Sequence, residues 1–324
     1  VMVIQSILSS LLMIFLMVIP GVIFQKRRMI TEEQGDAVNS IIVNLTWPCL
    51  VIDAMQMEFS AKILRESSYI FLICVIVFGC LFLLSFLLAR WLKFSERRQY
   101  LMTFMLLFGN TGFIGIPVIR VLYGETAVFF MAVIEMINDI LIFTVGIFLI
   151  QLSAGANVKA EWRKMCSPGM LGVLIGLVLF LCRITLPETL GRAVEMMGNA
   201  TTPLTMFMIG FQLGGLRVSE IMAEWQTCIV SLFKLILVPA LCLAVVMGID
   251  ILLPSGEGCL SLMEKVVVLS FAMPVGSVAA IFSRQYRTDS TFAVRTVLLS
   301  TFFCFIALPV FAILLEKVSE MGGF

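Results

Sequence analysis

The sequence predicts an all-α polytopic membrane protein with ten transmembrane helices arranged as two inverted five-helix repeats. Three observations support this prediction. Apolar residues make up 60% of the 324 residues and charged residues 13%, whereas soluble domains hold about 45–50% and about 25%. Apolar runs recur along nearly the whole chain. Polar residues and prolines also recur at matched positions in the two halves.

Ten segments satisfy the requirement for about 20 apolar residues to cross the bilayer core as a helix. They are residues 3–24, 38–57, 67–92, 99–122, 126–150, 168–186, 194–214, 225–253, 265–284 and 290–316. Five spans per half is an odd number, so the second half enters the membrane upside down. We therefore expect a first repeat at 1–150, a short cytoplasmic linker at 151–167 and a second, inverted repeat at 168–324.

Basic residues predict the orientation of these spans. Thirteen Lys and Arg residues lie in or beside the odd-numbered loops and five in the even-numbered loops. Short loops rich in Lys and Arg stay on the cytoplasmic side, so we expect a multi-pass protein of the cytoplasmic membrane with both termini outside. The lipid bilayer is then one partner. The net charge of +1 argues against nucleic acid, and a homodimer stays open.

Matched polar positions within apolar spans predict the inverted repeat. The pattern Asn-x-Thr-x-Pro occurs at residues 44–48 and 199–203, in spans two and seven and 155 residues apart. Pro117 in span four and Pro274 in span nine form a second pair, 157 residues apart. Both motifs also match the N-glycosylation acceptor N-x-T, but that role would need a surface loop, and neither flank looks like one. Interrupted helices in corresponding positions are typical of transporters with inverted repeats.

Spans four and nine are the spans that we expect to be broken. A proline removes one backbone hydrogen bond, and the freed groups are tolerated in lipid only against protein or a wet cavity. Glycines recur every third residue from 109 to 115, while Gly276 and Ser277 follow Pro274. If the two spans cross, half-helix N-termini with exposed N–H groups favour an anion. A simple kink at each proline is the alternative.

One stretch of span four also carries a family resemblance. The residues are Asn110, Thr111, Gly115, Ile116, Pro117, Arg120, Tyr123 and Gly124. They match N-T-x-x-x-G-I-P-x-x-K-x-x-Y-G, with Arg for Lys. In this the chain resembles the auxin efflux carrier family, which includes the plant PIN auxin transporters and bacterial organic-acid carriers. Pro274, Gly276, Phe282, Tyr286 and residues 307–309 add to the likeness, which extends over essentially the whole chain.

The resemblance implies that spans four and nine cross at their prolines and that an organic anion binds beside the crossing, against Asn110. It also implies a scaffold of spans one, two, six and seven, against which the other six spans rock. The plant proteins have a long cytoplasmic loop where this chain has the short segment 151–167. Asn138 and Asp139 stand where the plant proteins are aromatic, which favours an acid smaller than an indole.

These arguments define a candidate anion site. It comprises Asn110, Thr111, Pro117, Pro274, Gly276 and Ser277, with Asn44 and Asn199 facing it from the scaffold. The alternative for the two scaffold asparagines is a simple hydrogen bond between helices, worth about 0.6 kcal/mol on average.

Charged residues within spans form the second candidate group, because each costs on the order of 2.5–3.5 kcal/mol at a span centre. The candidates for proton coupling are Glu135, Asn138, Asp139 and Asp53, the first three sharing one helix face. Their candidate charge partners are Arg120, Lys234 and Arg295. Structural ion pairing is the alternative for the acids. Arg120 would either attract a carboxylate or anchor the helix at the outer interface.

We predict a secondary active transporter or facilitator of small organic anions, either mono- or dicarboxylates, working by alternating access. Two alternatives stay open: a cation/proton antiporter on a related crossed-helix fold, and a membrane ligand sensor without transport. An enzyme is not expected, because no base–nucleophile arrangement stands out and the chain contains no histidine. Without histidine or a C-x-x-C pair, we expect neither a metal site nor a cofactor.

Overall fold

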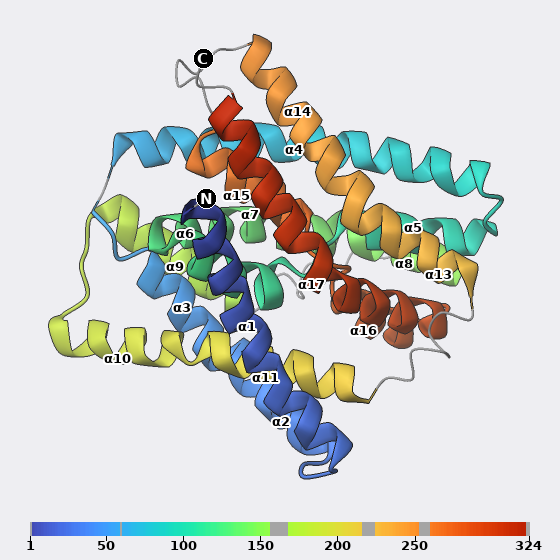
Figure 1. Cartoon of the computed structure of the whole chain (residues 1–324), viewed down its shortest axis with the longest axis horizontal. Coiled ribbons are helices and arrows are strands. Elements are labelled where there is room, and N and C mark those ends of the chain that lie inside the picture. The colour runs from blue at the N-terminus through green and yellow to red at the C-terminus, as the bar shows by residue number, and fades with distance from the viewer. Residues whose placement is uncertain (1, 59, 156–167, 216–223, 253–259, 322–324) are drawn as a thin grey trace. The chain divides into compact units, whose positions relative to one another are not determined.

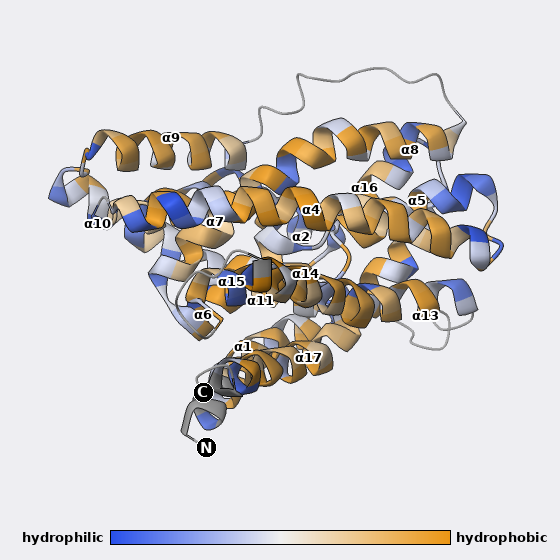
Figure 2. Ribbon diagram, turned by 90° about the horizontal axis from the view of Figure 1, so that it is seen from above, coloured by the Kyte–Doolittle hydropathy of each residue, from blue (hydrophilic) through white to orange (hydrophobic). Residues whose placement is uncertain are grey.

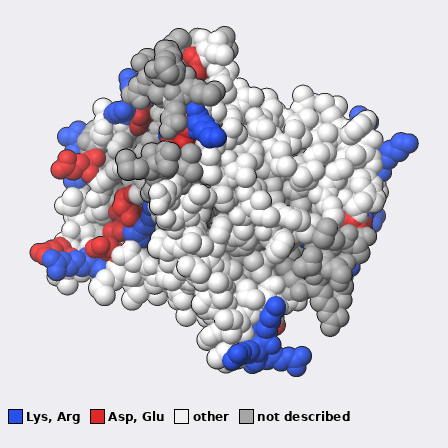
Figure 3. Space-filling model, viewed as in Figure 1, with Lys and Arg blue, Asp and Glu red and all other residues white. Residues whose placement is uncertain are grey.

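The structure, a computed structural model, is nearly all-helical and describes residues 2–58, 60–155, 168–215, 224–252 and 260–321. Six helices in these ranges are long and apolar enough to cross a membrane: Leu8–Lys26, Glu32–Ala54, Ala61–Trp91, Glu125–Ala154, Trp225–Ile251 and Ser290–Ser319. Figure 2 shows hydrophobic residues along most of α9 and α17. Figure 3 shows a broad surface almost free of charged side chains, which gather towards the margins of that view. The all-α, polytopic membrane class is therefore confirmed.

The other four predicted spans are interrupted or short. Span four consists of α5 (Glu96–Leu107) and the helix Thr111–Tyr123, and span nine of α15 (Leu262–Phe271) and α16 (Val278–Gln285). Span seven divides at Ala200 into α10 (Glu188–Asn199) and α11 (Thr201–Gly214), while span six is α9 (Pro168–Cys182). These pieces are too short to count as single crossings by length, so the number of ten spans stays a prediction.

The chain forms two compact units that are interleaved in sequence. The first unit comprises residues 1–68, 112–136 and 165–216, and the second comprises 69–111, 137–164 and 217–324. The first unit thus holds the four spans expected in the scaffold, together with 112–136, which the resemblance placed in the other bundle. The predicted boundary between repeats, 151–167, lies mostly outside the described residues, and the repeats themselves stay a prediction.

The first unit is built on close contacts between helix backbones. Its helices are α1 (Met2–Lys26), α2 (Glu32–Ile41), the π-helix η1 (Ile42–Thr46), α3 (Trp47–Ala54), α6 (Ile116–Tyr123), most of α7 (Glu125–Leu141), α9, α10 and α11. Helices α1 and α11 lie side by side (Figure 1). A Cβ added at Gly21 would lie 1.9 Å from Phe207 O, and one at Gly210 would lie 1.9 Å from Val18 O. Only glycine permits this approach, as at many helix contacts in membranes.

The two Asn-x-Thr-x-Pro segments meet in the first unit. Helices α9 and α10 both pack on α3. A Cβ at Gly198, just before the second motif, would lie 2.8 Å from Cα of Leu50, just after the first motif. A Cβ at Gly172 would lie 2.9 Å from Cα of Pro48. The matched motifs therefore mark a place where spans two and seven touch through their backbones.

The second unit holds most of α4 (Ala61–Trp91), α5, η3 (Ile142–Gly146), α8 (Ile147–Ala154), α13 (Trp225–Leu232), η5 (Phe233–Leu237), α14 (Val238–Leu252), α15, α16 and α17 (Ser290–Met321). Within it, α5 packs on α8, α13 on α17 and α14 on α15. Aromatic rings pack in its interior. The ring centroids of Phe78 and Phe271 are 5.2 Å apart, and those of Phe104 and Phe108 are 4.9 Å apart.

Three π-helical turns precede a proline at the second position of the next α-helix. They are η1 before Pro48, η2 (Thr111–Gly115) before Pro117 and η5 before Pro239. A proline has no N–H to donate, and its ring clashes with the preceding turn. A wider turn of the π type before the proline accommodates this. At Pro48 and Pro239 the helix continues on both sides of the π turn, whereas η2 begins directly after the non-helical Asn110. A proline in these spans therefore does not by itself interrupt the helix.

Candidate functional site

Two interrupted segments pair in the second unit, and this pairing is the centre of the candidate site. Helix α5 ends at Leu107, and Phe108 is extended, with φ −102° and ψ 112°. Gly109 forms an isolated antiparallel bridge with Val275. The Asn110 N–H donates to Pro274 O at 2.8 Å, and the Gly276 N–H donates to Phe108 O at 3.1 Å. The prediction that spans four and nine are both interrupted and meet is confirmed.

The position of one predicted proline needs correction. Pro274 takes part in the pairing, but Pro117 does not: it lies in the first turn of α6, seven residues after Asn110 along the chain. The π-helical turn η2 accommodates Pro117 without a break. The helix is interrupted earlier, at Gly109-Asn110, because glycine costs conformational entropy in a helix and asparagine hydrogen-bonds readily to non-helical backbone. The expectation that the spans cross at both prolines is therefore wrong for span four.

The backbone of the crossing satisfies its own hydrogen bonds. The Val275 N–H donates to the Ser300 Oγ of α17 at 3.1 Å. With the bonds from Asn110 and Gly276, all three amides have acceptors, as they must within a membrane. A Cβ at Gly276 would lie 3.0 Å from Gly109 O, so glycine is needed there for close approach. Positive charge for an anion must therefore come from other groups than these amides.

Polar side chains from several elements gather at the crossing. The buried Asn110 Nδ2 donates to the Ser277 Oγ at 3.2 Å. The buried Asn138 Nδ2, on α7, donates to the Thr111 Oγ1 at 3.0 Å. Four of the predicted residues are thereby brought together in pairs within the second unit.

A lysine also reaches the crossing. The Lys234 side chain, in η5, is fully buried, and its Nζ donates to Leu106 O at 2.9 Å. The same Nζ is 3.5 Å from the position of a Cβ on Gly109. The sequence singled out Lys234 as a charge partner for an acid, but its hydrogen bond is to a backbone carbonyl at the end of α5.

The scaffold asparagines are in the first unit and are exposed. The Asn44 Nδ2 donates to Ser40 O at 2.8 Å and to Ser40 Oγ at 3.1 Å, within its own helix. Asn199 is exposed at the end of α10. The threonines of the motifs, Thr46 and Thr201, are buried instead. That both asparagines face an anion stays a prediction.

The predicted acids and cations fall in different places. Glu135 is buried in the first unit, where its Oε1 is 2.8 Å from the position of a Cβ on Gly112. Asp139, on the same continuous helix α7, is half-buried in the second unit. Arg120 pairs with Glu125 at 2.6 Å and approaches Asp53 at 3.9 Å.

Proteins with related sequences support a transport role. The profile of a family described as membrane transport protein matches residues 6–163 and 157–312. The chain belongs to this family. It is 21% identical over 308 residues to an uncharacterized transporter of Methanothermobacter thermautotrophicus, covering 95% of this chain and 98% of the relative. It is 21% identical to the uncharacterized transporter YfdV of Escherichia coli K12, covering 74% and 78%. It is also 21% identical to auxin efflux carrier component 8 of Arabidopsis thaliana, covering 55% and 60%.

The membership confirms the resemblance seen in span four, and the family is one of membrane transporters rather than enzymes. This member of the membrane transport family also has an ion cluster that the sequence did not predict. Arg98, at the start of α5, donates to Asp289 at 2.8 Å and also bonds Glu224 and Gln226. Its guanidinium carbon is 5.0 Å from the Phe292 ring centroid.

The Arg98 cluster ties together the starts of α5, α13 and α17. Burial alone would lower the pKa of Arg98, but hydrogen bonds to Glu224 and Asp289 outweigh it and raise that pKa, so the guanidinium stays charged. Arg295 approaches Glu224 at 3.9 Å. Loop charge marked Arg98 as cytoplasmic, but its partners lie more than a hundred residues away in sequence.

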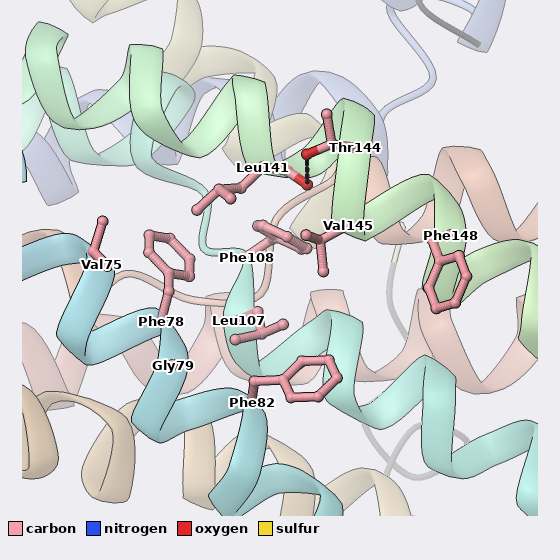
Figure 4. Close-up of a pocket in the computed structure, with 10 residues that line it drawn as sticks. All are labelled: Val75, Phe78, Gly79, Phe82, Leu107, Phe108, Leu141, Thr144, Val145 and Phe148. Atoms are coloured by element: carbon pink, nitrogen blue, oxygen red, sulfur yellow. Dashed lines mark hydrogen bonds between the residues drawn. The ribbon is translucent and has the colours of Figure 1, made fainter. Parts of the chain in front are cut away.

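An apolar cavity of about 590 Å³ in the transporter's second unit borders the crossing. Its lining residues are Val75, Phe78, Gly79, Phe82, Leu107, Phe108, Leu141, Thr144, Val145 and Phe148 (Figure 4). The Thr144 hydroxyl donates to Ile140 O at 2.7 Å, so it is engaged within its own helix. The cavity thus offers a carboxylate no strong partner, whereas the adjoining crossing holds amide, hydroxyl and ammonium groups.

Proposed function

We propose that the protein transports small organic anions, mono- or dicarboxylates, across the cytoplasmic membrane by alternating access. The observation that carries this proposal is the buried crossing of 108–110 with 274–276, where Asn110, Ser277 and Lys234 supply hydrogen-bond donors inside an apolar unit. Family membership supports transport, and a relative named for auxin efflux supports an organic solute.

The proposed architecture has ten spans in two inverted repeats, with both termini outside. Its support is the matched interruption of spans four and nine and the excess of basic residues in odd loops. The first unit would act as the scaffold and the second would carry the crossing during the transport cycle. Division of the chain into two compact units is compatible with such a rocking motion.

Proton coupling is proposed for the acidic face of α7. Glu135 is buried, and Asn138 contacts Thr111 at the crossing. A carboxylate removed from water takes up a proton more readily, so Glu135 and Asp139 are suited to link protonation to substrate. Asp53 is assigned a structural role instead, because Arg120 lies beside it.

Thermal stabilisation of the purified protein tests the proposal. A ligand that binds the folded state raises apparent stability, so sodium acetate, pyruvate, benzoate, malonate and succinate would be screened alongside sodium chloride. We expect at least one acid to raise the melting temperature of wild type and to be taken up by proteoliposomes. The Asn110→Ala variant should lose both effects, because it removes the buried amide.

Two results would redirect the proposal. Stabilisation by cations and none by the acids, with flux abolished by Glu135→Gln, would favour the antiporter. Acid binding without uptake would favour the sensor. Neutral behaviour of Asn110→Ala in both assays would contradict the placement of the anion.

A further inference from the structure

Lys234 is a buried cation that the backbone contacts of the crossing do not neutralise. Its relative exposure is 0%, and every other Lys or Arg whose burial the structure describes is more than about one-tenth exposed. An ammonium carries three donor hydrogens, and Leu106 O accepts one at 2.9 Å. The lysine ion pairs found in the described part of the chain belong to Lys62 and Lys265. A buried ammonium without an ionic partner is costly, so the group either gives up its proton or gains a compensating anion. An anion at the crossing would keep the side chain charged.

The ammonium lies where a ligand at the crossing would meet it. Leu106 belongs to the last turn of α5, whose carbonyls are the negative end of that half-helix. Gly109 follows, and a Cβ there would be in ordinary contact with Lys234 Nζ at 3.5 Å. The positive-φ glycines of the described chain are Gly124 and Gly155. Glycine at 109 is therefore not required by backbone conformation, but it leaves room for a methyl group between Lys234 Nζ, Met273 Cβ and Met273 O, each 3.5 Å from the Cβ position.

We propose that Lys234 is the cation that binds the carboxylate of the transported acid. This rests on the proposed function and narrows its substrate class. One carboxylate oxygen would accept a hydrogen from Lys234 Nζ beside Gly109, next to the buried amide of Asn110 in the chain. A single buried cation compensates a single negative charge, and a second carboxylate would be left desolvated without a partner. The site is therefore selective for monocarboxylates over dicarboxylates.

The test compares wild type with Lys234→Met, Gly109→Ala and a control, Lys265→Met. Each protein is titrated with sodium acetate, pyruvate, benzoate, malonate and succinate, and binding is followed by thermal shift. We expect Lys234→Met to bind monocarboxylates at least about tenfold more weakly, because a charge-assisted hydrogen bond is lost. Its melting temperature without ligand should not fall, since an apolar side chain of similar length replaces an uncompensated charge.

Gly109→Ala separates ligand binding from support of the helix end. It retains the bond from Lys234 to Leu106 but places a methyl group 3.5 Å from the ammonium nitrogen. We expect about tenfold weaker binding with little change in melting temperature. Lys265 Nζ pairs with Glu316 Oε2 at 2.8 Å, and neither residue belongs to the crossing segments. Its replacement should lower melting temperature and leave acid affinity at the wild-type value.

The outcomes that overturn the inference differ from those that overturn the proposed function. If no acid stabilises wild type, the proposed function fails and the role of Lys234 fails with it. If acids bind wild type and both Lys234→Met and Gly109→Ala with equal affinity, only the role of Lys234 is wrong. Should Lys234→Met not fold, the affinity of Gly109→Ala decides. Equal affinity for malonate and acetate would contradict the monocarboxylate selectivity.

Discussion

Each of the two units contains a place where two polar segments meet, with proline in at least one of them, and these places are built differently. In the second unit, 108–110 and 274–276 leave the helical conformation and exchange backbone hydrogen bonds, with Asn110 buried beside Ser277. In the first unit, the chain stays helical apart from a π turn and one residue, and Gly198 rests against the backbone of Leu50. Its asparagines, Asn44 and Asn199, are exposed.

This difference separates the signal for helix contact from the signal for a polar site. Proline and asparagine occur in both places, so neither residue type alone marks the site. The second unit has glycines on both strands, and a Cβ at Gly276 would reach 3.0 Å from Gly109 O. Gly276 is the glycine that this close approach requires, whereas a Cβ at Gly109 would be in ordinary contact at 3.5 Å. A glycine packed against a helix, as at Gly198, only allows two helix backbones to approach closely.

Of the substitutions that test this comparison, the one with the largest expected effect on stability is in the first unit. Gly198→Ala would place a Cβ 2.8 Å from Leu50 Cα, so the helix backbones must separate. We expect a loss of about 1–3 kcal/mol, seen as a lower melting temperature in detergent. Gly191→Ala on the same helix is the matched control, because its nearest neighbour, Leu186 Cβ, is 3.9 Å away. Equal melting of the two variants would show that the backbones are not in contact.

Gly276→Ala should have a smaller effect on stability and a larger one on function. Its Cβ would displace the strands by a few tenths of an ångström, which disturbs the placement of Asn110. We expect acid uptake to fall about tenfold or more, because small misplacements in a binding site are costly. Gly248→Ala is the control, since a Cβ there meets no atom within 4 Å. Wild-type uptake by Gly276→Ala would contradict a binding role for the crossing.

Arg98→Gln tests the ion cluster that ties α5 to α13 and α17. The Arg98 side chain is 28% exposed, so solvent screens its pairs with Glu224 and Asp289. We expect a loss of roughly 1 kcal/mol, which shrinks at high salt because exposed pairs are screened. Lys62→Gln removes a more exposed pair with Glu66 and should not change melting measurably. A salt-independent loss in Arg98→Gln would instead point to its packing on Phe292.

Asn44→Ala should have the smallest effect. Its amide bonds Ser40 within the same helix, so we expect a change within about 0.5 kcal/mol and uptake close to wild type. Asn199→Ala is its partner variant, and Asn110→Ala is the comparison from the crossing. If Asn44→Ala abolishes uptake as Asn110→Ala is expected to, the scaffold asparagines do face the substrate.

Local sequence rules predicted the class of the protein and the interrupted spans, because hydropathy and Gly/Pro content act over short distances. They misplaced the interruption in span four, which lies at residues 108–110, because Pro117 fits into the first turn of α6 after the π turn η2. They did not predict that Lys234 contacts Leu106, 128 residues away, or that Ser300 accepts the Val275 N–H. Such contacts depend on tertiary packing, and a lone Lys or Ser in an apolar span gives no indication of its partner.

The most direct measurement is an experimental structure with a bromine-substituted member of the acids that stabilise the protein, located by anomalous scattering. We predict a bromine peak close enough for the acid's carboxylate to hydrogen-bond Asn110 Nδ2 or Lys234 Nζ. A peak confined to the apolar cavity at Phe82 and Phe148, with the carboxylate distant from both donors, would contradict the account.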